Sequence, residues 1–162
     1  MKREDPYLRL AMLARQEELL QFEFFNSDVA LEIGLRLVRA AREARQAITV
    51  DITRHGQRLF YHAMNGTPPD HAHWIWRKSN LVKRTGHSSY HVHTQVTLGG
   101  GTIAAIATLD PREFAALGGA FPLTIRGSGV AGTITVAGLP GADDHALIVR
   151  VLRDYLRISE TL

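Results

Sequence analysis

Cysteine is absent from the 162-residue sequence. This absence excludes disulfides, zinc–thiolate sites, iron–sulfur clusters and thiolate nucleophiles, and it is typical of cytoplasmic proteins. A long hydrophobic run is also missing near the start, where Arg9, Arg15, Glu17 and Glu18 interrupt the apolar residues. That segment matches neither a signal peptide nor a membrane span. We therefore expect a cytoplasmic protein with no membrane partner.

A strong charge of either sign is missing as well. Lys and Arg total 19 against 16 for Asp and Glu, and the formal net charge of +3 is spread along the chain. The densest basic segment, RKSNLVKR at 77–84, is typical of a solvated helix face, so no nucleic-acid partner is expected. With 45% apolar residues the chain can bury one core, and residues 1–162 are expected to form a single domain.

Four helices are predicted from start signals and apolar periodicity. An Asp-Pro pair predicts a helix over 6–20, and NSD at 26–28 predicts the start of a second helix that runs to about residue 45. Asp70 is the expected cap of a third helix, whose apolar side carries Trp74, Ile75, Lys78, Leu81 and Val82. The last helix is predicted from the stripe of Leu147, Ile148, Val151, Leu152 and Tyr155.

Two hairpins are predicted between these helices. The first covers 47–64 with its turn at His55-Gly56, and the second covers 121–138 with its turn at GSG, 127–129. Hairpins separated by helices cannot form a parallel sheet, so we expect an α+β fold with an antiparallel sheet and helices on its faces. The segment 87–98 fits both strand and helix periods, and its periodicity does not decide between them.

Lys78 stands out because it lies inside an apolar helix stripe. A lysine there must snorkel, find a partner or serve a ligand, since an unpaired buried charge costs several kcal/mol. Arg77 and Lys78, together with the Gly118-Gly119 loop, form a candidate anion site, because arginine grips carboxylates with two donors and glycine lets backbone N–H groups come close.

A second candidate group, ADDH, lies at the start of the last helix. Capping accounts for one aspartate, which leaves Asp144 and His145 as candidates for acid–base or binding roles. No GxSxG, P-loop or GxGxxG motif is present, so neither a marked serine nucleophile nor nucleotide binding is predicted.

Histidines recur at spacings that suit a metal. His87 and His91 would share a helix face, whereas His91 and His93 would share a strand face, and His71 and His73 are also two apart. Two imidazoles make half a site, and the sequence does not identify a third ligand. We therefore assign no metal from the sequence, although a metal-dependent hydrolase or oxygenase stays open as a third hypothesis.

Several motifs carry a family resemblance: W..RK..LV at 74–82, SSY at 88–90, ALGGAFPL at 116–123, G..G...V.GLP at 129–140 and DDH at 143–145. With these motifs the chain resembles the UPF-type uncharacterised proteins of the haem-degrading-domain superfamily, which includes HbpS-like and GlcG-like proteins. The resemblance implies a profilin-like fold, a homo-oligomer and a helix over 87–98. The family commonly has serine where Ala137 stands here, and His87, His91 and His93 lie outside the shared motifs.

The resemblance leads to two hypotheses of function. The first is a homo-oligomeric small-ligand-binding protein, with haem as its ligand and an accessory haem-degrading activity as a further expectation. Haem requires an axial ligand such as His or Tyr, and cations for its propionates, for which Arg77 or Lys78 are available. The alternative is a non-catalytic oligomeric interaction module. In either case the ligand-binding or interface residues are expected to be Arg77, Lys78, Gly118, Gly119, Phe121, Asp144 and His145, and no catalytic residue or reaction is assigned.

Overall fold

The computed structural model describes residues 4–106 and 108–162. The first two helices begin where their caps predict. In α1 (Pro6–Leu19), the carboxylate of Asp5 accepts a hydrogen bond from the backbone N–H of Tyr7. In α2 (Ser27–Glu43), the side chain of Asn26 accepts one from Val29. Both helix predictions are confirmed, because each cap satisfies a backbone donor that the helix itself leaves free.

Four strands form one antiparallel sheet, in the order β2-β1-β4-β3. The strands are β1 (Thr49–Arg54), β2 (Gln57–Ala63), β3 (Ala120–Ile125) and β4 (Gly129–Ala137). Both predicted hairpins are confirmed, and β1 pairs with β4 in the middle of the sheet. The α+β prediction is therefore correct.

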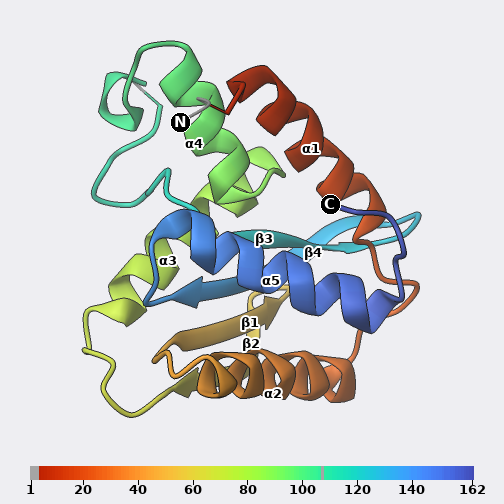
Figure 1. The fold of residues 1–162 in the computed structure, drawn as a ribbon. Coiled ribbons are helices and arrows are strands. Elements are labelled where there is room, and N and C mark those ends of the chain that lie inside the picture. Colours follow the sequence, from red (N-terminus) through yellow and green to blue (C-terminus); the bar gives the residue numbers. More distant parts are fainter. Residues whose placement is uncertain (1–3, 107) are drawn as a thin grey trace.

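Helices cover both faces of this sheet (Figure 1). On one face, α2 and α5 (Gly141–Leu156) pack against apolar side chains such as Ile134 and Val136, which form the main core. The opposite face is more polar, and there Ser79 of α3 (His71–Thr85) shares a hydrogen bond with Thr135. The alternation along β4 thus separates an apolar core from a polar face beneath α3.

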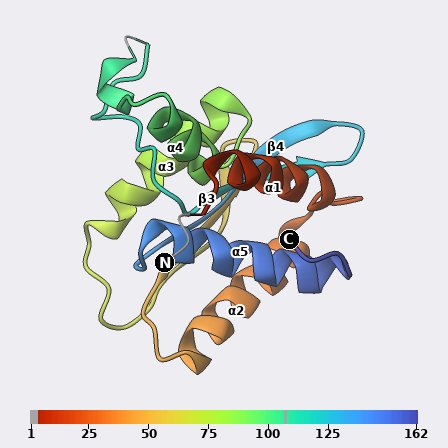
Figure 2. The same ribbon diagram turned by 45° about the horizontal axis from the view of Figure 1, so that its top comes forward.

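The remaining helices lie beside the β3 end of the sheet. α4 (Ser89–Leu98) packs along α1, and Figure 2 shows the two side by side. The segment 87–98 is thus helical from Ser89 onward, as the family resemblance implies. A 3-10 turn, η1 (Ile103–Ala105), follows α4. Among the described residues, no helix is long and apolar enough to cross a membrane.

Two predicted caps are wrong. Neither aspartate at the start of α5 caps that helix, because its cap position is Pro140 and no side chain makes a capping hydrogen bond there. Asp70 precedes α3 but makes no capping hydrogen bond to the helix backbone. Its carboxylate instead accepts a hydrogen bond from the indole Nε1 of Trp74, at 2.9 Å. A side chain one turn along the helix has thus taken the acceptor that a cap would have used.

Candidate functional site

Lys78 lies at the centre of the candidate site, with only 3% of its surface exposed. It projects from α3, and its ammonium group donates hydrogen bonds to the carbonyls of Gly118 and Val136. The Nζ atom also lies 3.4 Å from Oδ2 of Asp144 in α5. The snorkelling hypothesis is therefore wrong, because the lysine has found buried partners on three separate segments.

Asp144 is equally buried, and its environment disfavours ionisation. Burial raises the pKa of Asp144 to about 6, although Lys78 and a hydrogen bond from the backbone of Leu139 act in the opposite direction. Burial also lowers the pKa of Lys78, against the attraction of Asp144. Both shifts have the same origin, since removing either charged form from water is costly. Burial thus disfavours both charged forms, while the attraction between the two groups favours them.

The two neighbouring glycines allow this close packing. A Cβ atom at Gly118 would overlap the carbonyl of Gly141, and one at Gly119 would overlap Nζ of Lys78. Gly119 also has a φ of +125°, which residues with a side chain rarely adopt. The loop therefore needs glycine in order to reach the lysine and the first turn of α5.

A pocket of about 320 Å³ opens beside the Lys78–Asp144 pair. We call it the motif pocket, because it lies among the shared sequence motifs. Its lining residues are Pro68, Asp70, His71, Trp74, Lys78, Leu117, Gly118, Ala137, Gly138, Leu139, Gly141 and Asp144. The volume lies at the lower end of the range typical of ligand pockets.

His71 provides the imidazole of the motif pocket. Its Nδ1 lies 3.0 Å from the hydroxyl oxygen of Thr49. When Nδ1 donates its hydrogen to this hydroxyl, Nε2 carries the lone pair that can bind a ligand. Burial and the positive charge of Lys78 lower the pKa of His71, so the ring is neutral near pH 7. The sequence showed His71 only as one half of a two-apart histidine pair, and nothing in it distinguished His71 from His73.

Of the seven predicted site residues, only Lys78, Gly118 and Asp144 line the motif pocket. Gly119 packs behind it against Lys78, whereas Arg77, Phe121 and His145 lie outside it. The Nη2 of Arg77 donates a hydrogen bond to the carbonyl of Pro111 at 2.7 Å, and its guanidinium group lies over the ring of Trp74. Phe121 is a buried core residue on β3. The structure thus brings Lys78, Gly118, Gly119 and Asp144 together and leaves Arg77 and Phe121 apart from them.

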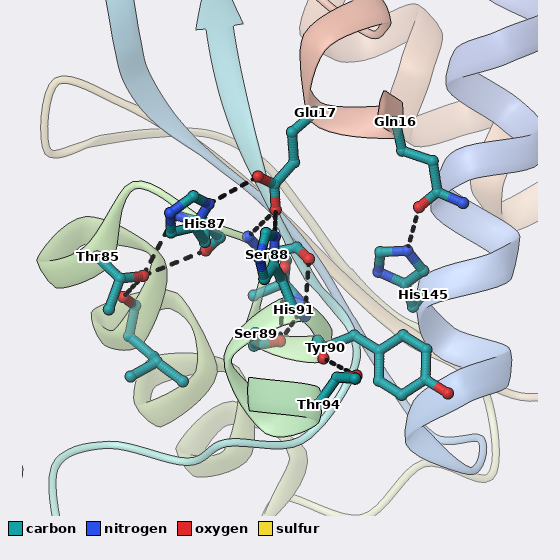
Figure 3. Close-up of polar contacts among 12 residues, drawn as sticks. Gln16, Glu17, Thr85, His87, Ser88, Ser89, Tyr90, His91, Thr94 and His145 are labelled. Atoms are coloured by element: carbon teal, nitrogen blue, oxygen red, sulfur yellow. Dashed lines mark hydrogen bonds and ion pairs between the residues drawn. The ribbon is translucent and has the colours of Figure 1, made fainter. Parts of the chain in front are cut away.

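His145 lines a different pocket from its neighbour Asp144. Its Nε2 lies 2.7 Å from Oε1 of Gln16, and burial lowers the pKa of His145 to about 4 (Figure 3). Its Nδ1 is buried and has no hydrogen-bond partner among the described residues. The pocket beside it, of about 410 Å³, is also lined by Tyr90 and by Arg9, Arg150 and Arg153.

Of the three clustered histidines, the structure sets His93 apart and keeps His87 and His91 together. His93 points its Nδ1 at the carbonyl of Ala116, at 2.9 Å. His87 and His91 both contact Glu17 of α1, a residue that the sequence did not single out (Figure 3). Burial raises the pKa of Glu17, but hydrogen bonds from the two histidines and Ser88 outweigh it and make the net shift downward. Glu17 is therefore ionised and anchors the start of α4 to α1.

Comparisons with known proteins agree with the fold and the motifs. The chain is 44% identical to a UPF0303 protein of Edwardsiella ictaluri over 93% of its own length and 96% of that protein. The crystal structure of Ybr137w matches 93% of this chain and 88% of the other, at 26% identity and a TM-score of 0.83.

A more distant structure, a PduOC–haem complex, matches 76% of this chain and 88% of the other, at 14% identity and a TM-score of 0.64, which shows a shared fold. The family model described as "Haem degrading protein HbpS-like" matches residues 25–153. The described residues thus combine the fold and the sequence motifs of one group, and the chain belongs to the HbpS-like family, with UPF0303 proteins among its relatives.

Proposed function

We propose that this protein is a homo-oligomeric small-ligand-binding protein that binds haem, or a closely related macrocycle, at the motif pocket. One observation carries the proposal: residues of four shared motifs surround a single pocket, and that pocket contains His71, whose Nδ1 contacts Thr49 while its Nε2 has no hydrogen-bond partner among the described residues. The family description and the haem complex of one fold neighbour support haem as the ligand class.

The donor set of the motif pocket fits the iron of haem. His71 would hold the iron through Nε2, and its contact with Thr49 is the type of outer hydrogen bond that orients ligating histidines. Trp74, Leu117 and Leu139 supply apolar surface for a flat macrocycle. Bound haem would supply the redox chemistry of its iron, and the part of this chain is to bind and orient it.

The motif pocket offers fewer partners for the propionates of haem than for its iron and its macrocycle. Lys78 is not available to them, because Gly118, Val136 and Asp144 already occupy its ammonium group. The remaining donors are the backbone N–H groups at the very start of α5, in a turn that also carries Asp143 and Asp144. In this proposal Lys78 and Asp144 shape the pocket wall and do not contact the ligand.

An oligomeric form accords with both the pocket and the surface. A pocket of about 320 Å³ covers only part of a haem macrocycle, so a neighbouring subunit would complete the enclosure. Large apolar side chains are exposed on α1 and α2, among them Tyr7, Leu8, Leu31 and Leu35. Such residues are typical of subunit contacts.

The alternative of a purely structural module gains less support. In that hypothesis the polar groups of the motifs pair across subunits. Lys78 and Asp144 instead pair with each other and with backbone groups of the same chain. Their polar groups are thus already satisfied without a partner.

A haemin titration followed at the Soret band tests the proposal. The wild-type protein should give a saturable, shifted band, and His71→Ala should weaken it at least tenfold because the iron loses its axial nitrogen. His73→Ala is the matched control, since His73 is an exposed histidine of the same helix. A shapeless, non-saturating absorbance that is equal in all variants would refute haem binding. Loss of haemin binding in Tyr90→Phe but not in His71→Ala would indicate that haemin binds in the pocket beside His145 instead.

A further inference from the structure

Three ligand-type side chains meet where α1 contacts the start of α4. The Nδ1 of His87 lies 2.8 Å from Oε2 of Glu17, and the Nδ1 of His91 lies 3.0 Å from Oε1 of the same carboxylate. The two imidazole rings are 4.3 Å apart between centroids. In Figure 3 the carboxylate of Glu17 points between the two histidines. We call these residues the Glu17 cluster.

The chemistry of the Glu17 cluster is that of a transition-metal site. Each of the three residues offers one ligand atom, and these atoms all lie within 4.8 Å of one another. Two histidines and one carboxylate form the ligand set of some catalytic zinc sites and of non-haem ferrous sites. Ligand atoms about 2.0–2.2 Å from a shared ion lie roughly 3–3.5 Å apart. The two histidine–carboxylate distances, 2.8 and 3.0 Å, are already this short, whereas the group as a whole, within 4.8 Å, must contract around an ion.

We propose that the Glu17 cluster binds one divalent transition-metal ion of the zinc or ferrous class. The metal would replace the two hydrogens that the imidazoles now share with the carboxylate. Three protein ligands leave a coordination position open to water or a substrate.

The surroundings favour a preformed site with access from solvent. The backbone N–H of Ser88 donates to Oε1 of Glu17 at 2.8 Å and fixes the carboxylate, as outer contacts do around known metal ligands. His91 is almost fully buried, whereas the side chain of His87 is 44% exposed. An ion can therefore reach the cluster past His87.

This site is separate from the haem-type function proposed for the motif pocket. Neither Glu17 nor the two histidines line that pocket. The ligands of the Glu17 cluster come from α1 and the α4 region, so a bound ion would link the N-terminal helix to the body of the fold. Binding of metal and of haemin can therefore be measured independently of each other.

Titration of chelator-treated protein with Co²⁺, followed by visible absorption, tests the proposal. We expect one Co²⁺ per chain, full displacement by Zn²⁺, and a higher melting temperature of the wild-type protein with Zn²⁺. His87→Ala and Glu17→Gln should each weaken binding at least tenfold and abolish this rise. His93→Ala is the control, because His93 lies on α4 with His91 but contacts the carbonyl of Ala116.

Loss of α1 docking could mask the result in Glu17→Gln, so circular dichroism should accompany each titration. His87→Ala decides the matter in that case, since its exposed ring contributes little to the core. Equal Co²⁺ binding in wild type, His87→Ala and His93→Ala would overturn the proposal. So would the absence of saturable binding in the wild type, which would leave the Glu17 cluster as a set of interhelical hydrogen bonds only.

Discussion

Lys78 joins α3 to three other segments through buried contacts with Gly118, Val136 and Asp144. Removing one partner of a buried ion pair leaves the other charge without compensation. We therefore expect Lys78→Met to lower the free energy of unfolding by about 3–5 kcal/mol, because Asp144 would remain buried. The double variant Lys78→Met/Asp144→Asn should recover most of that loss, since asparagine still accepts from Leu139. Urea denaturation measures the unfolding free energy of both variants. A double variant that is no more stable than Lys78→Met would contradict the prediction.

Asp144 should also make stability depend on pH. Its pKa is about 6 in the folded protein, compared with 3.8 for an ordinary aspartate, so between these values only the folded carboxyl is protonated. The free energy of unfolding should therefore fall as pH rises through this window, by at most about 3 kcal/mol from this group.

Asp144→Asn removes that contribution. We expect the difference in unfolding free energy between the wild type and this variant to change from pH 4 to pH 6.5, as measured by urea denaturation. Other carboxylates, Glu17 included, act in both proteins and cancel in the difference. A difference that is constant across this range would show that Asp144 has an ordinary pKa.

At the scale of elements, the loop before β3 should tolerate substitution much less than the turn between β3 and β4. Gly119→Ala would place a Cβ against Lys78 in a strained backbone conformation, so we expect a loss of about 2–4 kcal/mol. Gly127→Ala meets open space at a φ of +79°, and its loss should be about 1–2 kcal/mol. Thermal denaturation compares the two, and equal losses would show that the packing around Lys78 is not tight.

The elements themselves were largely predictable because their signals are local. The Asp5 and Asn26 caps and the two hairpins follow from residues within a few positions of each other. The prediction of a cap at Asp70 was wrong because both the helix backbone and the indole of Trp74 can donate to this carboxylate, and the sequence does not show which donor is preferred. The prediction of a helix in segment 87–98 depended on the family resemblance, since the periodicity of the segment fits both a strand and a helix.

The candidate site was predictable only in part, because its contacts join distant segments. The shared motifs pointed to Lys78, Gly118, Gly119 and Asp144, which the fold brings together. Helical rotation turns Asp144 and His145 toward different pockets, which adjacency in sequence conceals. The contact of Glu17 with His87 spans 70 positions, and no spacing rule indicates it.

At the scale of the whole molecule, the proposed function predicts an assembly of several chains. The chain has a mass of 18.0 kDa, and sedimentation equilibrium should give a multiple of that mass at micromolar concentration. Haemin should then saturate at a fixed ratio to subunits. A particle of 18.0 kDa at every concentration would contradict the homo-oligomer.

The most direct test of the central claim is hydrogen–deuterium exchange of the protein with and without haemin. Binding at the motif pocket predicts slower exchange in peptides that cover the start of α3, the 117–119 loop and the first turn of α5. Exchange in peptides from the α1–α4 contact should be the same with and without haemin. Protection confined to the pocket beside His145, or no protection at all, would contradict the assignment of the motif pocket as the haem-binding site.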